Sequence, residues 1–306
     1  MKPIILDVDT GIDDAMAIAY AAHSPELEIL AITTCFGNIT AEEATRNSLT
    51  VLEKLGKQVP VIQGAKETLC RGERDHYART VHGEDGLGNT VQHAPRGQAV
   101  VGHASDFIIE QVKRRPHEIT IISVGTLTNL ALAIQKDPGI VPLIREVIVM
   151  GGAVTVPGNV TPYGEANIVA DPEAAAFVFA AGLPLTLVGL DVTMQTLLPK
   201  SHLEAWRASG KAEGMFFADI AEFYMGAYES FYPGIGGCAL HDPLAVGVAI
   251  DRSLVEAQPM RVTVVTEGEQ TGRTVGSFEG EPKINVCLKV DADRFLAHFM
   301  DRIVGV

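Results

Sequence analysis

Four aspartates fall within eight residues near the start of the chain, in the segment Asp7-Val8-Asp9-Thr10-Gly11-Ile12-Asp13-Asp14. An apolar, strand-like run precedes them and a helix-like run follows. Side chains two apart on a strand face the same side, so Asp7 and Asp9 lie together, and the turn at Gly11 returns Asp13 and Asp14 toward them. Clustered carboxylates repel one another when ionised, so each raises the pKa of its neighbours. A hard cation such as Ca²⁺ offsets this repulsion by binding their oxygens. A lone aspartate here would be interpreted as a helix cap, but four indicate a cation site.

A second place for chemistry is His241-Asp242, which is followed by Pro243 and a helical run. A helix N-terminus stabilises the anionic form of Asp242 and disfavours a positive charge on His241. His241 is therefore expected to release a proton readily. The alternative interpretation is structural, with Asp242 as the N-cap and Pro243 at the first helical position.

Two long glycine-rich loops offer further polar side chains. Residues 64–98 include His82, and residues 151–167 include Asn159, Glu165 and Asn167. Loops of this length in compact domains are usually functional or disordered. Carboxylate and amide groups of the second loop suit sugar hydroxyls, although such residues are also common on solvated loops.

The elements that must position these residues alternate between strand and helix. Strands are expected at residues 2–7, 27–34, 59–63, 119–124, 147–150, 185–188, 258–266 and 282–290. Helices are expected at residues 12–22, 41–55, 104–114, 127–135, 172–181 and 292–303, and through most of residues 200–250. Continuous apolar strands alternating with helices predict an α/β fold, a mostly parallel open sheet of the Rossmann-like kind flanked by helices. Ligands of such sheets bind at the C-terminal strand ends, and one domain over residues 1–306 is expected.

The pattern Asp-x-Asp-x-Gly-x-Asp-Asp resembles the signature of the inosine–uridine-preferring nucleoside hydrolase family. Haloacid-dehalogenase-type phosphatases also end a first strand in Asp-x-Asp, but they have Thr or Val where this chain has Gly11. They also have no use for the Asp13-Asp14 pair. A calcium-binding protein without catalytic activity is a third possibility, and it gives no reason for His241 beside Asp242.

The resemblance continues along the chain in the same order. The similar segments are Thr33 to Asn38, Val81 to Gly88, Ser123 to Leu130, Met150 to Ala153 with Gly158 to Asn167, and Leu240 to Ala245. Taken singly, each has an ordinary structural interpretation, such as the Gly37-Asn38 turn. With the acidic segment they span residues 5–245, and nothing diagnostic follows residue 250.

The resemblance implies hydrolysis of the N-glycosidic bond of ribonucleosides to free base and ribose. It places Ca²⁺ on Asp9, Asp14, Asp242 and the Thr126 carbonyl, with a Ca²⁺-held water deprotonated by Asp9. His241 is the implied leaving-group acid. The expected substrate-binding residues are Asp13, Asn38, His82, Asn159, Glu165, Asn167 and Tyr228. Tyr228 is the least specific of these, because its spacing from Tyr224 also fits a core stripe. The presence of His241 favours a broad inosine–uridine preference.

Composition limits the partners and the compartment. The net charge is −14 and the pI is near 5.0, which argues against nucleic acid as a partner. The four cysteines show no paired spacing, no apolar run reaches the roughly 18 residues of a membrane span, and the N-terminus lacks a signal-peptide core. We therefore expect a cytoplasmic enzyme with a small-molecule substrate, without nucleic-acid or membrane partners. The family resemblance further implies a homo-oligomer, a tetramer or a dimer.

Overall fold

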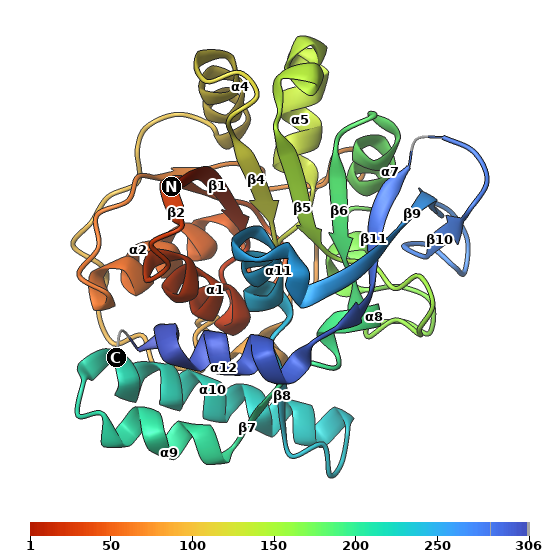
Figure 1. Ribbon diagram of the computed structural model, residues 1–306. Coiled ribbons are helices and arrows are strands. Elements are labelled where there is room, and N and C mark those ends of the chain that lie inside the picture. Colours follow the sequence, from red (N-terminus) through yellow and green to blue (C-terminus); the bar gives the residue numbers. More distant parts are fainter. Residues whose placement is uncertain (282, 305–306) are drawn as a thin grey trace.

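The computed structural model describes residues 1–281 and 283–304. Within these residues a nine-stranded sheet forms the centre of the molecule, in the order β10-β9-β11-β6-β5-β4-β1-β2-β3 (Figure 1). Its strands are β1 (Lys2–Val8), β2 (Leu27–Thr34), β3 (Val61–Gln63), β4 (Thr120–Ser123), β5 (Glu146–Met150), β6 (Leu185–Val188), β9 (Val255–Val264), β10 (Thr274–Ser277) and β11 (Ile284–Val290). In the sheet order, neighbouring strands are parallel from β11 through to β3, whereas β9 is antiparallel to both of its neighbours, β10 and β11. The predicted mostly parallel α/β sheet is confirmed.

Helices cover both faces of the sheet (Figure 1). One face carries α4 (Ala104–Arg114), α5 (Thr128–Lys136) and α7 (Pro172–Ala180), and the other carries α1 (Ile12–Ala22), α2 (Ala41–Lys54), α11 (His241–Ile250) and α12 (Ala292–Ile303). The remaining helices are α3 (Arg79–His82), α6 (Ala166–Ala170), α8 (Leu190–Thr193), α9 (Ser201–Ala208) and α10 (Ala212–Phe231).

Two hydrophobic cores follow from the alternation of side chains along the strands. In β5, Ile148 and Met150 belong to the core beneath α1 and α11. Val147 and Val149 belong to the core beneath α5 and α7. Burial on both faces explains why these strands read as continuous apolar runs in the sequence.

The strand register brings the C-terminal strand ends to one edge. Asp7 in β1 is paired with Thr33 in β2 and with Ser123 in β4. Ser123 is paired in turn with Val149 in β5. The residues that follow β1, β2, β4 and β5 therefore emerge side by side, although β1 and its neighbour β4 lie far apart in the chain, at Lys2–Val8 and Thr120–Ser123.

Several sequence expectations need correction. The predicted helical stretch of residues 200–250 is interrupted by the glycine-containing segment 233–237 and by strand β8 (Gly237–Ala239), which pairs antiparallel with β7 (Leu197–Pro199). Helix α11 begins at His241 with Leu240 as its N-cap, so Asp242 is not the cap residue. Strand β10, only four residues long, was not predicted. The strand expected from Pro282 is observed as β11 from Ile284, and Pro282 lies outside the described residues.

None of the helices in the described ranges combines the length and the apolar character needed to cross a membrane.

Candidate active site

A cavity of about 550 Å³ opens at the C-terminal edge of the sheet. Its wall contains all seven residues expected to bind substrate: Asp13, Asn38, His82, Asn159, Glu165, Asn167 and Tyr228. His241 and Asp242 also line it. Residues from six separate segments thus meet at one place, which the strand register makes possible.

Three buried carboxylates form the acidic part of this site. Asp13, Asp14 and Asp242 each offer an oxygen, and these oxygens lie within 4.8 Å of one another. Asp13 and Asp14 belong to the first turn of α1, and Asp242 belongs to the first turn of α11. Two helix N-termini therefore point their positive ends at the cluster, which favours negative charge there.

Asp9 lies directly beside this cluster. Its backbone N–H donates to Asp14 Oδ1 at 3.1 Å, and its Oδ2 accepts the Asn38 backbone N–H at 2.7 Å. Gly37 is required for this approach, because a Cβ atom there would lie 1.9 Å from Asp9 Oδ2. The end of β4 adjoins the same carboxylate, since a Cβ atom on Gly125 would lie 3.0 Å from Asp9 Oδ1. Thr126, whose carbonyl was expected to bind the cation, is the next residue and is buried.

Burial and mutual repulsion disfavour the ionised forms of these carboxyl groups. Burial, followed by the charge of Asp14, raises the pKa of Asp9 well above its usual range. Burial raises the pKa of Asp14 to about 7, with Asp13 adding to the rise, and it raises the pKa values of Asp13 and Asp242 as well. Within the described residues, Asp9 Oδ1 and Asp13 Oδ1 are buried without a hydrogen-bond partner. Hard oxygen ligands with unused lone pairs fit a divalent cation such as Ca²⁺.

Asp7 differs from the other three aspartates of its segment. Its carboxylate accepts hydrogen bonds from Thr33 Oγ1 at 2.6 Å and Asn129 Nδ2 at 2.8 Å. Burial raises its pKa to about 6, while these hydrogen bonds oppose the rise. Asp7 therefore joins β1, β2 and α5 beneath the site and has its own partners.

His82 closes one side of the cavity as a neutral ring. Its Nδ1 accepts the Ile12 backbone N–H at 3.0 Å, so the ring proton resides on Nε2. Burial lowers the pKa of His82 to about 3. Asp13 Oδ1 lies 3.9 Å from Nδ1, but a nitrogen that accepts a hydrogen bond forms no ion pair there. The ring stacks on Tyr224 with a centroid distance of 5.3 Å.

His241 is held between two hydroxyl groups. Its Nδ1 is 2.7 Å from Thr193 Oγ1 and its Nε2 is 2.5 Å from the Tyr228 hydroxyl. Burial lowers the pKa of His241 to about 4, although Asp13 opposes the change. The imidazole is therefore neutral near pH 7, and the Tyr228 hydroxyl connects it to the cavity.

Tyr224 is a lining residue that the sequence interpretation assigned to a core stripe. Its hydroxyl donates to Asp13 Oδ2 at 3.2 Å, and its ring meets Tyr228 edge to face at 4.9 Å. Both tyrosines are buried, as a core stripe predicts, but α10 turns them toward the cavity. The four-residue spacing from Tyr228 was the available signal, since it places both rings on one helix face.

The polar loop between β5 and α6 forms the opposite wall. Glu165 is fixed by backbone N–H groups of Gly152 at 2.9 Å and Asn167 at 2.9 Å, and it caps α6. Asn167 Nδ2 donates to the Val124 carbonyl at 2.7 Å, and Asn159 Oδ1 accepts the Ala166 N–H at 3.0 Å. All three side chains therefore have defined orientations at the cavity wall.

Two residues that the sequence did not single out hold the start of this loop. Asp191, in the first turn of α8, accepts backbone N–H groups of Val154 at 2.9 Å and Thr155 at 2.6 Å. Thr274 in β10 accepts from the Ala153 N–H and donates to the Ala153 carbonyl, both at 2.9 Å. No local sequence pattern identifies such contacts, because their partners lie far away in the chain.

Comparison with known proteins gives a consistent result. Residues 4–297 match the family model described as inosine-uridine preferring nucleoside hydrolase. The chain is 36% identical to probable uridine nucleosidase 2 of Arabidopsis thaliana, over 99% of this chain and 98% of that protein. It is 38% identical to the pyrimidine-specific ribonucleoside hydrolase RihB of Escherichia coli, over 96% and 94%. A solved structure of a purine-preferring ribonucleoside hydrolase from Gardnerella vaginalis superposes with a TM-score of 0.96 at 41% identity, covering 99% of this chain and 98% of that chain.

Proposed function

Since the chain belongs to the inosine–uridine preferring nucleoside hydrolase family and is therefore an enzyme that hydrolyses ribonucleosides, we propose how its cavity cleaves the N-glycosidic bond. The observation that carries the proposal is the buried cluster of Asp13, Asp14 and Asp242 in a cavity lined by polar groups and by aromatic rings. The carboxylate cluster suits a cation, the polar lining groups suit a ribose, and the aromatic rings suit a nucleobase.

In this proposal Asp9, Asp14, Asp242 and the Thr126 carbonyl bind Ca²⁺. The unpartnered Oδ1 of Asp9 and the raised pKa values of Asp9 and Asp242 support this ligand set. Asp13 lies close enough to Asp14 and Asp242 to add to the negative electrostatic potential at the proposed cation site. When bound, the cation would make a nearby water more acidic and attract the ribose 2′ and 3′ hydroxyls.

Asp9 is the proposed general base toward the attacking water. Its Oδ2 is fixed by the Asn38 N–H, which leaves Oδ1 free to accept a proton. Desolvation raises the proton affinity of such a carboxylate, which improves a base that must work near neutral pH.

The remaining polar residues orient the sugar. Asp13 would accept from a ribose hydroxyl through its unpartnered Oδ1, a contact that strengthens as positive charge develops on the ring. Asn159, Glu165 and Asn167 would bind the other side of the ribose. Asn38, whose Nδ2 donates to Asp14 Oδ2, would bind the sugar beside Asp14. Because their orientations are preset by hydrogen bonds, little conformational freedom is lost when substrate binds.

His241 is the proposed leaving-group acid, acting together with Tyr228. The low pKa of His241 works against a stored imidazolium. A proton taken up by His241 from solvent would pass from Nε2 to the Tyr228 oxygen as the Tyr228 hydroxyl proton passes to the departing base, which returns both side chains to their neutral forms. The 2.5 Å contact between Nε2 and the Tyr228 hydroxyl supports this relay. His82, neutral and stacked on Tyr224, would contact the nucleobase with its Nε2–H edge.

We further propose a broad inosine–uridine preference. The relatives include proteins described as purine-preferring, pyrimidine-specific and uridine-acting, so kinship alone favours no single base. Stacking on tyrosine and histidine rings is tolerant of base identity, because every base has a π face.

We also propose how the protein is organised. A match over residues 4–297 supports one nucleoside hydrolase domain, and the four free cysteines suit a cytoplasmic enzyme. We also propose a homo-oligomer, a tetramer or a dimer, which light scattering of the purified protein would measure.

Ribose release from inosine, adenosine, uridine and cytidine tests the proposal. The assay is run with and without a calcium chelator, and with a phosphomonoester as the alternative substrate. We expect turnover of both purine and pyrimidine nucleosides that disappears on chelation and returns with Ca²⁺. Turnover that survives complete chelation would contradict the metal assignment, and activity on a single base would contradict the broad preference.

A further inference from the structure

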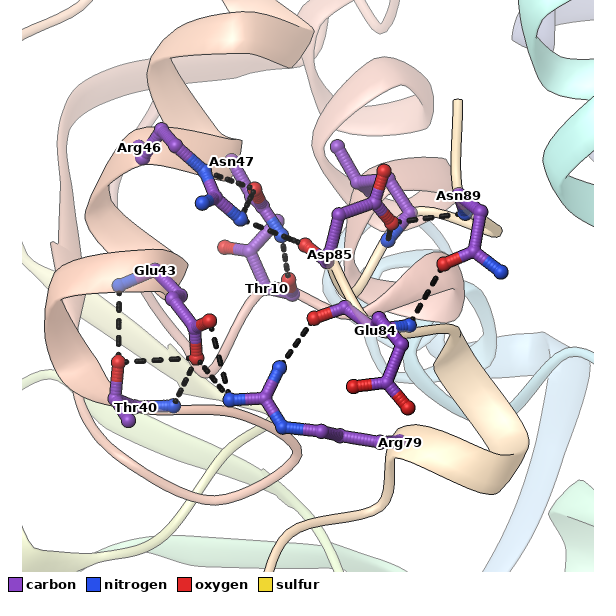
Figure 2. A network of polar contacts seen from close by, with 10 residues as sticks. Thr10, Thr40, Glu43, Arg46, Asn47, Arg79, Glu84, Asp85 and Asn89 are labelled. Atoms are coloured by element: carbon purple, nitrogen blue, oxygen red, sulfur yellow. Dashed lines mark hydrogen bonds and ion pairs between the residues drawn. The ribbon is translucent and has the colours of Figure 1, made fainter. Parts of the chain in front are cut away.

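The loop of residues 79–91, here called the His82 loop, is held against helix α2 by a polar network (Figure 2). The loop carries Thr80, Val81 and His82, which line the cavity. It also contacts the acidic segment directly, through the hydrogen bond from the Ile12 backbone N–H to His82 Nδ1 at 3.0 Å. The residues that fix its position therefore fix one wall of the site.

Asn47, in helix α2, joins the two segments from a third element. Its Nδ2 donates to the Thr10 carbonyl at 3.1 Å and to the Asp85 carbonyl at 2.8 Å. Thr10 lies between the acidic residues Asp9 and Asp13, and Asp85 follows His82 by three positions. One buried amide thus connects the acidic segment with the His82 loop, as Figure 2 shows.

The orientation of this amide is determined by its neighbours. Arg46 donates from Nε at 3.1 Å and from a terminal nitrogen at 3.0 Å to Asn47 Oδ1. The same guanidinium donates to the Asp85 carbonyl at 2.8 Å. Both protons and both acceptor sites of the Asn47 amide are used, so its two ends cannot be exchanged without losing every bond.

The loop itself is ordered around Asp85 and Gly86. The Asp85 carboxylate accepts backbone N–H groups of Leu87 at 2.7 Å, Asn89 at 2.9 Å and Val91 at 2.8 Å. Gly86 adopts φ +80°, and a Cβ atom there would lie 2.7 Å from Asn47 Nδ2. The loop therefore closes tightly over the amide, and a shift of Asn47 must move the loop.

A second attachment lies at the surface. Arg79 pairs with Glu43 at 2.9 Å, and both side chains are partly exposed. Exposed ion pairs contribute little because water and salt screen them. The buried amide is therefore the stronger of these two side-chain attachments, and it acts beside the direct hydrogen bond from the Ile12 N–H to His82.

We propose that Asn47 is a positioning residue, which sets the distance between the acidic segment and His82 and so prepares the nucleobase side of the cavity. This inference rests on the proposed contact between His82 and the base. Asn47 does not itself line the cavity, and its effect on catalysis must pass through the His82 loop.

The substitution Asn47→Asp tests this proposal, because it keeps the shape of the side chain and removes both N–H donors. The carbonyl groups of Thr10 and Asp85 then face a carboxylate in place of two N–H donors. We therefore expect kcat/KM for inosine and uridine to fall about tenfold or more. Asn89→Asp is the matched control on the same loop. It keeps the oxygen that accepts the Glu84 N–H at 2.8 Å, so activity should stay within about twofold of the parent.

A double-mutant cycle with His82→Ala separates positioning from a general loss of structure. If Asn47 acts through His82, Asn47→Asp should cost less than about twofold in the His82→Ala background. An undiminished tenfold loss in that background, or an unchanged kcat/KM in Asn47→Asp, would overturn the proposal. The parent enzyme's own turnover is measured alongside, so failure of the proposed function would appear separately as a parent without activity.

Amide hydrogen exchange gives a readout that does not depend on catalysis. In Asn47→Asp we expect faster exchange at residues 83–91 and unchanged exchange in β1 and β5, whereas Asn89→Asp should match the parent. Should Asn47→Asp fail to fold, Arg46→Gln removes the two bonds to Asn47 Oδ1 and the bond to the Asp85 carbonyl, and it is expected to cause a change in the same direction. Unchanged exchange at residues 83–91 in both variants would contradict the role.

Discussion

At the scale of single residues, the site contains aspartates whose ionised forms are disfavoured by burial. Asp9, Asp13, Asp14 and Asp242 are buried together, and burial raises the pKa of each. A cluster of this kind binds either protons or a cation, because several adjacent carboxylates do not ionise together without compensation. His241 shows the opposite response to the same surroundings, since burial lowers its pKa to about 4.

The substitution Tyr228→Phe tests the leaving-group assignment. It removes the hydroxyl that lies 2.5 Å from His241 Nε2 and retains the ring packing against Tyr224. We expect kcat for inosine and uridine to fall by about 10²–10³, within the usual range for general acid catalysis. A riboside of 4-nitrophenol, which departs without protonation, should be hydrolysed at close to the parent rate. An equal loss on both substrates would show that Tyr228 acts in binding or folding and not in protonation.

At the scale of elements, strand ends and helix N-termini bring distant side chains together. The loop between β5 and α6 is held by α8 through Asp191 and by β10 through Thr274. Strands β9 and β10 are the antiparallel extension of the sheet, for which the sequence suggested no role. The contact of Thr274 with Ala153 assigns β10 one, since it supports the loop that carries Asn159, Glu165 and Asn167.

The substitution Thr274→Val measures this support. It removes two hydrogen bonds to Ala153 in a buried position, so the free energy of unfolding should fall by about 1–3 kcal/mol. The KM for nucleosides should rise more than kcat falls, because the proposed role of the loop is to bind the sugar. Thr263→Val, on the exposed side of β9, is the control and should alter neither quantity. A stable Thr274→Val enzyme with an unchanged KM would argue against the support.

The sequence predicts the regular part of this organisation well and the irregular part poorly. Apolar runs such as Val147 to Met150 identify the parallel strands because both faces are buried. Strands β7, β8 and β10 are short and depend on partners that local periodicity does not report, whereas the longer β9 was predicted over most of its length. In the site, the acidic segment is evident from its spacing, whereas Tyr224, Thr193 and Asn47 gain their roles only from contacts made across the fold.

At the scale of the whole molecule, we expect the charge distribution to couple the proposed cation binding to stability. The chain carries a net charge of −14, and its buried carboxylates add repulsion within the fold. A cation that binds the folded state alone stabilises it by about 2.7 kcal/mol when its concentration is about 100 times Kd. The metal-free enzyme is therefore expected to be measurably less stable than the loaded one.

Thermal denaturation with and without Ca²⁺ tests this coupling. We expect chelation to lower Tm by several degrees and added Ca²⁺ to restore it, following the mass-action dependence on concentration. Mg²⁺ should restore less, because it demands a small octahedral site and loses its water reluctantly. Equal Tm values in chelator and in Ca²⁺ would contradict the coupling.

The central claim is that the buried aspartates hold a divalent cation on which nucleoside hydrolysis depends. The most direct test measures bound Ca²⁺ per chain by titration calorimetry together with ribose release, in the parent and in Asp14→Asn. The surface substitution Asp106→Asn, on a side chain that pairs with Lys136, serves as the control. We predict one ion per chain in the parent and in the control, with weaker binding and a parallel loss of ribose release in Asp14→Asn. Full ribose release from a chain that binds no cation would contradict the claim.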